Sequence, residues 1–308
     1  MEAPLITLAR LIDSFEIHLK GRQMSAKTVS TYCRAARSLS GWLETEKSIT
    51  AAADVDRSAL ELYFAWMTVN GGRDGTGRKP GGVSVDYRAL QQFFKWADEI
   101  EDEITPNPMA KMRPPVVPDP ETPVLRDEEI TRLLKVCEGK DFMARRDTAM
   151  ISLLLDTGVR LSELANLKVD EVNVADREAY VMGKGRRARV APFGHVTARA
   201  LDRYLRVRVD HPRASLSGLW LGDRHAVMTS DGIDQMIRRR GRAAGIADLH
   251  AHMLRHTWAH HSKDVLHDDE LMRLAGWKSR QMLQRYAAST ADERARESGK
   301  KHAFLDRR

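Results

Sequence analysis

Three side chains that suit a bound phosphate recur at helical spacing toward the C-terminal end of the chain. His252, Arg255 and His256 belong to the sequence HMLRH, which opens an apolar helical run. Positions three and four apart share one face of a helix, so these side chains can point at a common target. A fixed guanidinium and a protonatable imidazole suit an anionic oxygen, above all that of a phosphate. Tyr286, nine positions after Trp277, would be a nucleophile if it reached the same place.

Two further positively charged side chains lie at positions that the predicted local structure would expose, one at a helix end and one in a turn. Arg160 occurs in TGVRLSEL, after a buried helix that stops at Gly158, and Lys184 lies in a GKG turn between two expected strands. Each has an ordinary alternative: an arginine at a helix start is usually ion-paired or exposed, and a lysine in such a turn is usually solvated. Short motifs match by chance, so only the combination of these separated segments is specific.

The histidines of this region could also suggest a metal site, since His256 and His260 are one helical turn apart. No HExxH motif occurs and no cysteine lies near them, so we expect no metal. His256 is then a structural partner, and His260 and His261 are surface or packing residues. The acidic run 268–270 is better explained as favourable charge at the N-terminus of a helix.

Four helices are predicted in residues 1–112, which makes this region a small all-helical domain. Apolar residues recur at helical spacing, and the second and fourth helices can begin at the caps Ser25 and Ser84. The glycine-rich basic segment 70–82 matches neither phosphate-binding spacing, G-x-x-x-x-G-K-[ST] or G-x-G-x-x-G after a strand. A mobile connection between helices is therefore favoured there.

A proline-rich linker, residues 113–124, follows this domain, and its five prolines favour an extended, semi-rigid spacer. Residues 125–290 then form a second domain. It is helical except at 171–193, where the apolar period changes to that of short strands. The predicted fold class is mainly α with a small antiparallel β-sheet. The tail, residues 291–308, is polar and charged.

The composition excludes several classes of protein. A hydrophobic fraction of 42% rules out wholesale disorder, and 308 residues suggest two domains. The net charge of +7 is consistent with nucleic acid binding without requiring it. We recognise no signal peptide and no apolar run long enough to span a membrane. Two cysteines without a disulfide framework fit a reducing cytoplasm.

The combination of motifs resembles the tyrosine recombinase (phage integrase) family, which includes the Xer enzymes. TGVRLSEL is similar to the family's first arginine segment, GKGRRARVAPF to its hairpin-lysine segment, and HMLRHT to its His-x-x-Arg segment. LAGWKS with the downstream tyrosine is similar to the last segment. The resemblance implies six catalytic residues: Arg160, Lys184, His252, Arg255, Trp277 and Tyr286. Trp277 stands where most members have histidine, and because an indole N–H only donates, it cannot shuttle a proton.

The resemblance also implies the reaction and the role of each domain. Tyr286 would attack the DNA backbone to give a covalent 3′-phosphotyrosyl link, strands would be exchanged through a Holliday junction, and neither metal nor ATP would be required. Residues 1–112 would be a SAM-like domain that binds the core site, and residues 125–290 the catalytic domain. The tail 291–308 would dock on a neighbouring protomer, with simple disorder as the alternative. The expected assembly is a homo-tetramer on double-stranded attachment or core sites, with an accessory directionality factor as a further partner.

An integrase of a phage or mobile element is the expected function. A Xer-type resolvase of chromosome dimers fits the length equally well, and a non-catalytic DNA-binding regulator is the alternative from another class. The full set of catalytic residue types argues against the regulator. Basic side chains of both domains are expected to contact DNA: Arg34, Arg37, Arg88, Lys95, Arg186, Arg187, Arg189, Arg238, Arg239 and Arg240.

Overall fold

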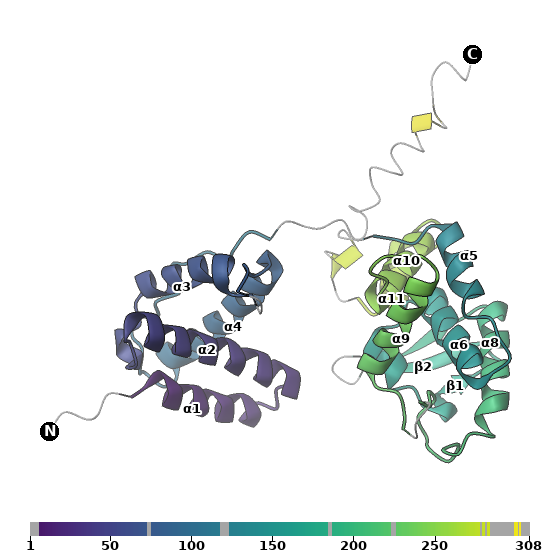
Figure 1. Cartoon of the computed structure of the whole chain (residues 1–308), viewed down its shortest axis with the longest axis horizontal. Helices are drawn as coiled ribbons and strands as arrows, with labels where there is room; N and C mark the ends of the chain where they lie inside the picture. The colour runs from purple at the N-terminus through teal and green to yellow at the C-terminus, as the bar shows by residue number, and fades with distance from the viewer. Residues whose placement is uncertain are drawn as a thin grey trace. The chain divides into compact units, whose positions relative to one another are not determined.

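The chain forms two compact units, Met1–Pro120 and Glu121–Arg308 (Figure 1). The computed structural model describes residues 6–72, 75–117, 123–183, 187–222, 226–277, 279–280, 282–283, 299–300 and 302. Each unit has its own hydrophobic core. Within the described residues, no helix combines the length and the apolar character that crossing a membrane would require.

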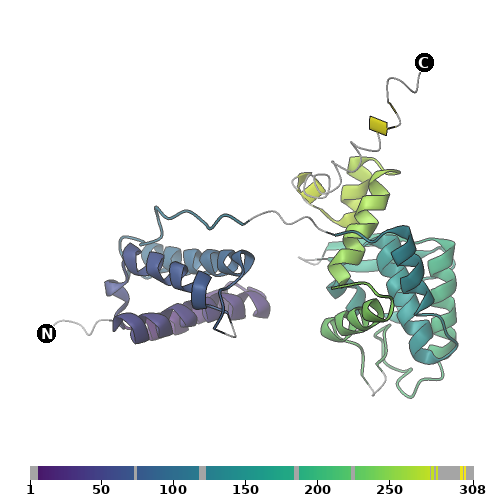
Figure 2. The same cartoon turned by 45° about the horizontal axis from the view of Figure 1, so that its top comes forward.

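Unit 1 is a bundle of helices, in agreement with the sequence. Its elements are α1 (Leu8–Gly21), α2 (Ala26–Lys47), the short 3-10 helix η1 (Ala52–Asp54), α3 (Arg57–Asn70) and α4 (Pro80–Glu99). Helix α2 packs against both α1 and α4, which can be followed among the purple and blue ribbons of Figure 2. The side chain of Ser25 caps α2 by accepting a hydrogen bond from Thr28 N at 3.2 Å, as predicted.

The prediction that Ser84 caps the fourth helix is wrong. Helix α4 begins one turn earlier, with Lys79 as the preceding residue and Pro80 at its first position. Proline is favoured at the start of a helix because its φ is already helical and its missing N–H has no intrahelical partner there. Ser84 is instead buried within the helix.

Unit 2 confirms the predicted fold class, mainly α with a small antiparallel sheet. Its described elements are α5 (Asp127–Lys135), α6 (Phe142–Thr157), α7 (Leu161–Ala165), η2 (Val169–Glu171), β1 (Val172–Asn173), β2 (Glu178–Gly183), β3 (Arg187–Pro192), α8 (His195–Arg208), α9 (Ser230–Ala243), α10 (Ala251–Lys263) and α11 (Asp268–Ala275). The strands pair in the order β1-β2-β3, all antiparallel.

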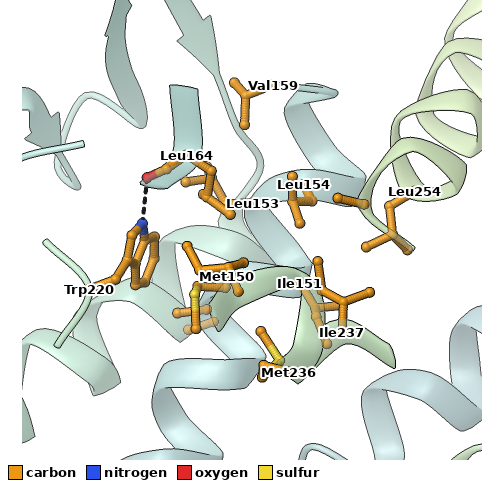
Figure 3. Packing of buried hydrophobic residues seen from close by; sticks show 14 of the residues in the cluster. Met150, Ile151, Leu153, Leu154, Val159, Leu164, Trp220, Met236, Ile237 and Leu254 are labelled. Atoms are coloured by element: carbon orange, nitrogen blue, oxygen red, sulfur yellow. Dashed lines mark hydrogen bonds between the residues drawn. The ribbon is translucent and has the colours of Figure 1, made fainter. Parts of the chain in front are cut away.

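Helix α6 lies at the centre of unit 2 because its apolar residues surround it almost completely. It packs against α8 on one side and α10 on another. Figure 3 shows its Met150 and Ile151 among Met236 and Ile237 of α9. Nearby, the indole N–H of Trp220 donates to the carbonyl of Leu164 in α7 at 2.8 Å. The site-bearing helix α7 is thereby fixed to the core.

The two faces of the β2–β3 hairpin differ. Ala179 and Val181 of β2 and Ala191 of β3 are buried, whereas Tyr180 and Met182 are exposed on the opposite face. In the register of the hairpin, Val181 lies opposite Arg189. Because side chains alternate along a strand, Arg189 shares the inward face with Ala191.

Two glycines in the left-handed region end helices that lead to the site. Gly158 follows α6 with φ +56°, and Gly276 follows α11 with φ +64°. A Cβ on Gly158 would lie 2.0 Å from the ring of Trp258 in α10. A side chain at this position would therefore push α6 and α10 apart, and the turn requires glycine for both reasons.

Candidate active site

A cavity of about 390 Å³ in unit 2 brings together four of the six residues that the sequence nominates. We call it the arginine cavity. It is lined by Val159, Arg160, Leu161, Asp231, Asp234, His250, Ala251, His252, Arg255, Trp277 and Met282. The four nominated residues, Arg160, His252, Arg255 and Trp277, come from three segments far apart in the sequence.

The N-terminal end of α10 lies at this cavity. His250 precedes the helix in an extended conformation, and the carboxylate of Asp234 accepts a hydrogen bond from the Ala251 amide at 3.3 Å. Asp234 thus ties the start of α10 to α9. His252 and Arg255 follow three positions apart, so both project from the face that lines the cavity.

Arg255 is a buried cation at the base of the cavity, with 3% of its surface exposed. Its Nη1 donates to the carbonyl of Gly158, and its Nη2 donates to the carbonyl of Ala275 at 2.7 Å. Its guanidinium carbon lies 5.7 Å from the centre of the Trp277 ring, within the range of a cation–π contact. These contacts fix the direction of a charge that two backbone carbonyls neutralise only partly.

Arg160 is more accessible, since 37% of its side chain is exposed. It precedes α7, and its backbone amide donates to Glu163 Oε2 at 2.8 Å. Its Nη1 donates to Glu163 Oε1 at 2.9 Å, and its Nη2 donates to the carbonyl of Gly276 at 3.2 Å. The guanidinium is therefore held in place while part of it faces the cavity.

Glu163 is a residue of the site that the sequence reasoning missed. Its side chain is buried and accepts hydrogen bonds from both Arg160 and Arg189. Burial by itself would raise the pKa of Glu163, but the bonds from Arg189 and Arg160 outweigh it, and the pKa is lower than usual. The available signal was its spacing, because a glutamate three residues after the residue preceding a helix often closes a capping box.

Arg189 was expected to contact DNA, and in the structure its guanidinium has partners inside unit 2. Its side chain is 13% exposed and lies on the inward face of β3. Nη1 and Nη2 donate to the two oxygens of Glu163 at 2.8 and 2.7 Å, and Nε donates to the carbonyl of Leu274 at 2.9 Å. All three nitrogens are thus engaged within unit 2.

Three consecutive carbonyls at the end of α11 each accept a bond from a different arginine. Leu274 binds Arg189, Ala275 binds Arg255, and Gly276 binds Arg160. The carbonyls of the last helical turn lack intrahelical partners and carry the negative end of the helix dipole, so they suit cations. The end of α11 therefore holds the arginines of three other elements in one group.

His252 faces the cavity in an environment that favours its neutral form. Burial lowers the pKa of His252 below its usual range, and the nearby charges of Arg255, His250 and Arg160 lower it further. The neutral imidazole retains one nitrogen that can accept a proton. This is the state that a general base requires near neutral pH.

We expect the rate of DNA cleavage to rise with pH through a midpoint below about 6.5 and then to level off. The reason is that only neutral His252 can accept the proton of an attacking hydroxyl, and its pKa is lowered. The measurement is the cleavage rate of labelled DNA at limiting protein, between pH 5 and pH 8. His252→Gln should be slower and should lack this inflection. A midpoint above 6.5, or an inflection that survives in His252→Gln, would contradict a role as base.

His256 lies one helical turn behind His252, and their rings meet edge to face with centres 4.2 Å apart. It is buried, which lowers its pKa to about 3, and the charges of His252 and Arg255 act in the same direction. His256 is therefore neutral in the folded protein near neutral pH. Its place beneath His252 supports the prediction of a structural partner.

This burial makes stability depend on pH. Below about pH 6.5, His256 binds a proton in the unfolded chain but not in the folded protein, so the free energy of unfolding falls as the pH is lowered. Between pH 7 and pH 5 the loss should be roughly 2 kcal/mol. The measurement is the free energy of unfolding in urea of the wild type and of His256→Asn. The difference between the two free energies should narrow by this amount from pH 7 to pH 5 and stay constant between pH 8 and pH 7. A difference that stays constant down to pH 5 would disprove the assignment.

The expected DNA contacts of unit 1 all lie on its surface: Arg34, Arg37, Arg88 and Lys95. Carboxylates contact three of them, and Lys95 lies 3.8 Å from Glu99. Arg37 contacts Glu16 at 2.5 Å, and Arg34 contacts Asp86 at the same distance. Asp86 is fully buried and also contacts Arg78 at 2.5 Å. Together, Arg34, Arg78 and Asp86 carry one net positive charge.

The three arginines of α9 that were expected to contact DNA differ in their exposure. Arg238 and Arg239 are exposed. Arg240 is largely covered, and its Nε donates to the buried carboxylate of Asp147 at 2.9 Å. An internal ion pair is therefore the observed role of Arg240.

Several nominated positions lie outside the described residues. They include Lys184, Arg186 and Tyr286, with the linker positions 118–122 and the tail apart from 299–300 and 302. Of Arg187 only the backbone is described. Their assignments stay predictions.

The chain is similar to known proteins in sequence and in fold. The model of the phage integrase family matches residues 123–293. The tyrosine recombinase XerC of Pseudomonas fluorescens is 28% identical over 286 residues, which cover 89% of this chain and 91% of that protein. The tyrosine recombinase XerD of Listeria innocua serovar 6a is 24% identical over 257 residues, covering 82% and 84%.

Solved structures share the fold. The XerH recombinase in a post-cleavage complex with a palindromic difH substrate matches with a TM-score of 0.73 and 19% identity, over 93% of this chain and 82% of that one. A lambda integrase dimer bound to a COC' core site matches with a TM-score of 0.71 and 18% identity, over 92% and 77%. With the family model matching more than half of its length, the chain belongs to the phage integrase family of tyrosine recombinases.

Proposed function

We propose that this protein is a site-specific DNA recombinase that breaks and rejoins strands through a covalent 3′-phosphotyrosyl intermediate. One observation carries the proposal. Arg160, His252, Arg255 and Trp277 come from three separate segments and line one cavity. Two arginines and a neutral imidazole around a space of about 390 Å³ suit a phosphate of the DNA backbone.

The two arginines neutralise the charge that accumulates at phosphorus. In a phosphodiester under attack, negative charge grows on the non-bridging oxygens, and fixed donors aimed at them lower the barrier. Arg255 supplies a charge held by the carbonyls of Gly158 and Ala275, and Arg160 supplies a partly exposed one. Because their bonds to the protein fix both groups beforehand, little reorganisation is needed during the reaction.

Tyr286 is the nucleophile in this proposal. Its attack on phosphorus forms the phosphotyrosyl ester, and the 5′-oxygen of the next nucleotide leaves with a proton from Lys184. His252 accepts the tyrosine proton. Because the ester conserves the energy of the broken bond, a 5′-hydroxyl from a partner strand can reverse the reaction without metal or ATP. Trp277 packs beside the arginines and moves no proton.

Strand exchange requires several copies on DNA. We propose a homo-tetramer on double-stranded core sites that passes through a Holliday junction. A solved lambda integrase tetramer bound to a Holliday junction supports this, since it shares the fold with a TM-score of 0.71. In the same proposal residues 1–112 bind the core site, residues 125–290 catalyse, and the tail 291–308 docks on a neighbouring protomer. The protein would act in the cytoplasm.

Two biological roles fit this chemistry. The first is integration and excision of a phage or mobile element, with an accessory directionality factor. The second is resolution of chromosome dimers, which the names of the XerC and XerD relatives favour. Recombination assays on a pair of unlike attachment sites and on a pair of identical chromosomal sites separate them. Exchange only between identical sites would support the second role and overturn the first.

The chemistry is tested by incubating the wild-type protein with nicked DNA half-sites, which trap the covalent intermediate. We expect an adduct that survives denaturation, carries a 3′-linked strand and is destroyed by protease. Peptide mapping should place the DNA on Tyr286. Binding without any adduct would support the non-catalytic regulator, and an adduct on another residue would overturn the assignment of the nucleophile.

A further inference from the structure

We propose that Arg189 is a positioning residue that balances the charge of Glu163 and so leaves the charge of Arg160 available to the DNA phosphate. This inference rests on the proposed function of the arginine cavity. It concerns a strand residue that does not line the cavity but contacts the carboxylate behind it.

Glu163 is saturated by two arginines. Its Oε1 accepts from Arg160 Nη1 at 2.9 Å and from Arg189 Nη1 at 2.8 Å. Its Oε2 accepts from the Arg160 amide at 2.8 Å and from Arg189 Nη2 at 2.7 Å. Arg189 therefore binds both oxygens in a parallel fork, whereas the guanidinium of Arg160 binds one. The fork is the stronger and more directional of the two arrangements.

The charges of the trio decide what a phosphate in the cavity would experience. Arg160 paired with Glu163 alone would form a neutral pair, whose field falls off faster than that of a single charge. With Arg189 added, the trio carries one net positive charge. Glu163 and Arg189 are the two covered members, with 2% and 13% of their side chains exposed, while Arg160 is 37% exposed. The net charge is therefore presented on the side of Arg160.

Glu163 has a reason to be present despite its charge. It anchors the backbone of Arg160 at the start of α7 and orients its guanidinium. A buried carboxylate this close to a phosphate would repel it unless a second cation compensated the charge. Arg189 supplies that cation from β3, and its bond to the carbonyl of Leu274 prevents it from turning toward the DNA itself.

Arginine is specifically suited to this position. A lysine has no planar fork and could not bind both oxygens of Glu163 and the carbonyl of Leu274 together. The inward face of the strand directs the side chain toward α7, because Arg189 lies opposite Val181 and on the same side as the buried Ala191. A merely mechanical tether between β3, α7 and α11 is the competing explanation.

A pair of variants that first removes the charge of Arg189 and then also removes the charge of Glu163 separates the two explanations. Arg189→Met leaves the neutral pair of Arg160 and Glu163, so cleavage should slow by at least about tenfold. Arg189→Met combined with Glu163→Gln restores one net positive charge, so cleavage should recover most of that loss. If Arg189 were only a tether, removing a second partner could not help, and the double variant would be as slow as the single one or slower.

The measurement is single-turnover cleavage of nicked half-site DNA at saturating protein, with the dissociation constant and the melting temperature determined in parallel. Arg208→Met is the matched stability control, since Arg208 is buried and donates to carbonyls of residues 214–219, outside the cavity. It should lower the melting temperature while the cleavage rate of the folded protein is kept. Arg189→Met should change the dissociation constant by less than about threefold.

Two results would overturn the inference: Arg189→Met that cleaves at the wild-type rate, or a double variant that fails to regain activity over Arg189→Met. Either leaves the proposed function intact, because the wild type still forms its adduct. A wild type without any adduct would instead contradict the proposed function itself.

Discussion

Tyr286→Phe should form no covalent adduct with nicked half-site DNA, while its affinity for the same DNA stays within about twofold of the wild type. The phenylalanine ring keeps the size of the side chain but has no oxygen to attack phosphorus. No other group in the proposed mechanism can replace it, so the loss should be complete rather than partial. Denaturing gels of labelled DNA measure the adduct, and titration of the same DNA measures binding.

Tyr180→Phe is the matched control. Three other tyrosines are fully buried, Tyr63, Tyr87 and Tyr204, and cannot reach a DNA backbone. Tyr180 is exposed on the hairpin, but its hydroxyl donates to the carboxylate of Glu178, which raises the pKa of Tyr180 and disfavours the nucleophilic form. Tyr180→Phe should therefore cleave as the wild type does. An adduct that persists in Tyr286→Phe would remove the central assignment of the mechanism.

Arg255→Gln should lower the single-turnover rate of cleavage by about 10²–10³-fold, which is the usual effect of losing one fixed donor to a developing oxyanion. Arg255 is the most constrained cation of the site, because two carbonyls and the Trp277 ring hold it. The loss should appear in the rate at saturating protein and much less in DNA affinity, since the net charge of +7 attracts the DNA backbone largely without this one residue.

The effect of Arg255→Gln on folding stability must be distinguished from its effect on the rate of cleavage. Removing a buried arginine leaves the carbonyls of Gly158 and Ala275 without this partner, so we expect a lower melting temperature as well. Arg208→Gln also removes a buried arginine that binds carbonyls, and it contacts a different loop. Comparable melting temperatures with a slow Arg255→Gln and a fast Arg208→Gln would assign the loss to the active site. Equal rates would show that Arg255 is structural.

Much of the site follows from local spacing in the sequence. The three-residue spacing of His252 and Arg255 places both on one face of a helix, and the structure puts both at one cavity. That Arg160 and Trp277 join them could be inferred only through the resemblance to a family. No local rule relates these separate segments, because the packing of α6, α7, α10 and α11 brings them together.

What the sequence reasoning missed depended on burial and on contacts between distant segments. In the sequence Arg189 resembles a surface cation in a run of arginines. It lies two positions before Ala191, so it shares the inward face of β3 once the register of the hairpin is known. Ser84 has the right chemistry for a cap, but Pro80 starts the helix earlier. Glu163 lies between Ser162 and Leu164 in TGVRLSEL, and its burial beside Arg189 of β3 could not be read from this local sequence.

The carbonyls at the end of α11 have a consequence for how the protein matures. Residues 160, 189 and 255 leave the ribosome before residues 274–276, yet their guanidinium groups are held by those later carbonyls. A nascent or truncated chain that ends before α11 therefore has these arginines but lacks one of the bonds that hold each of them. The phosphate site is thus completed only after α11 has been synthesised.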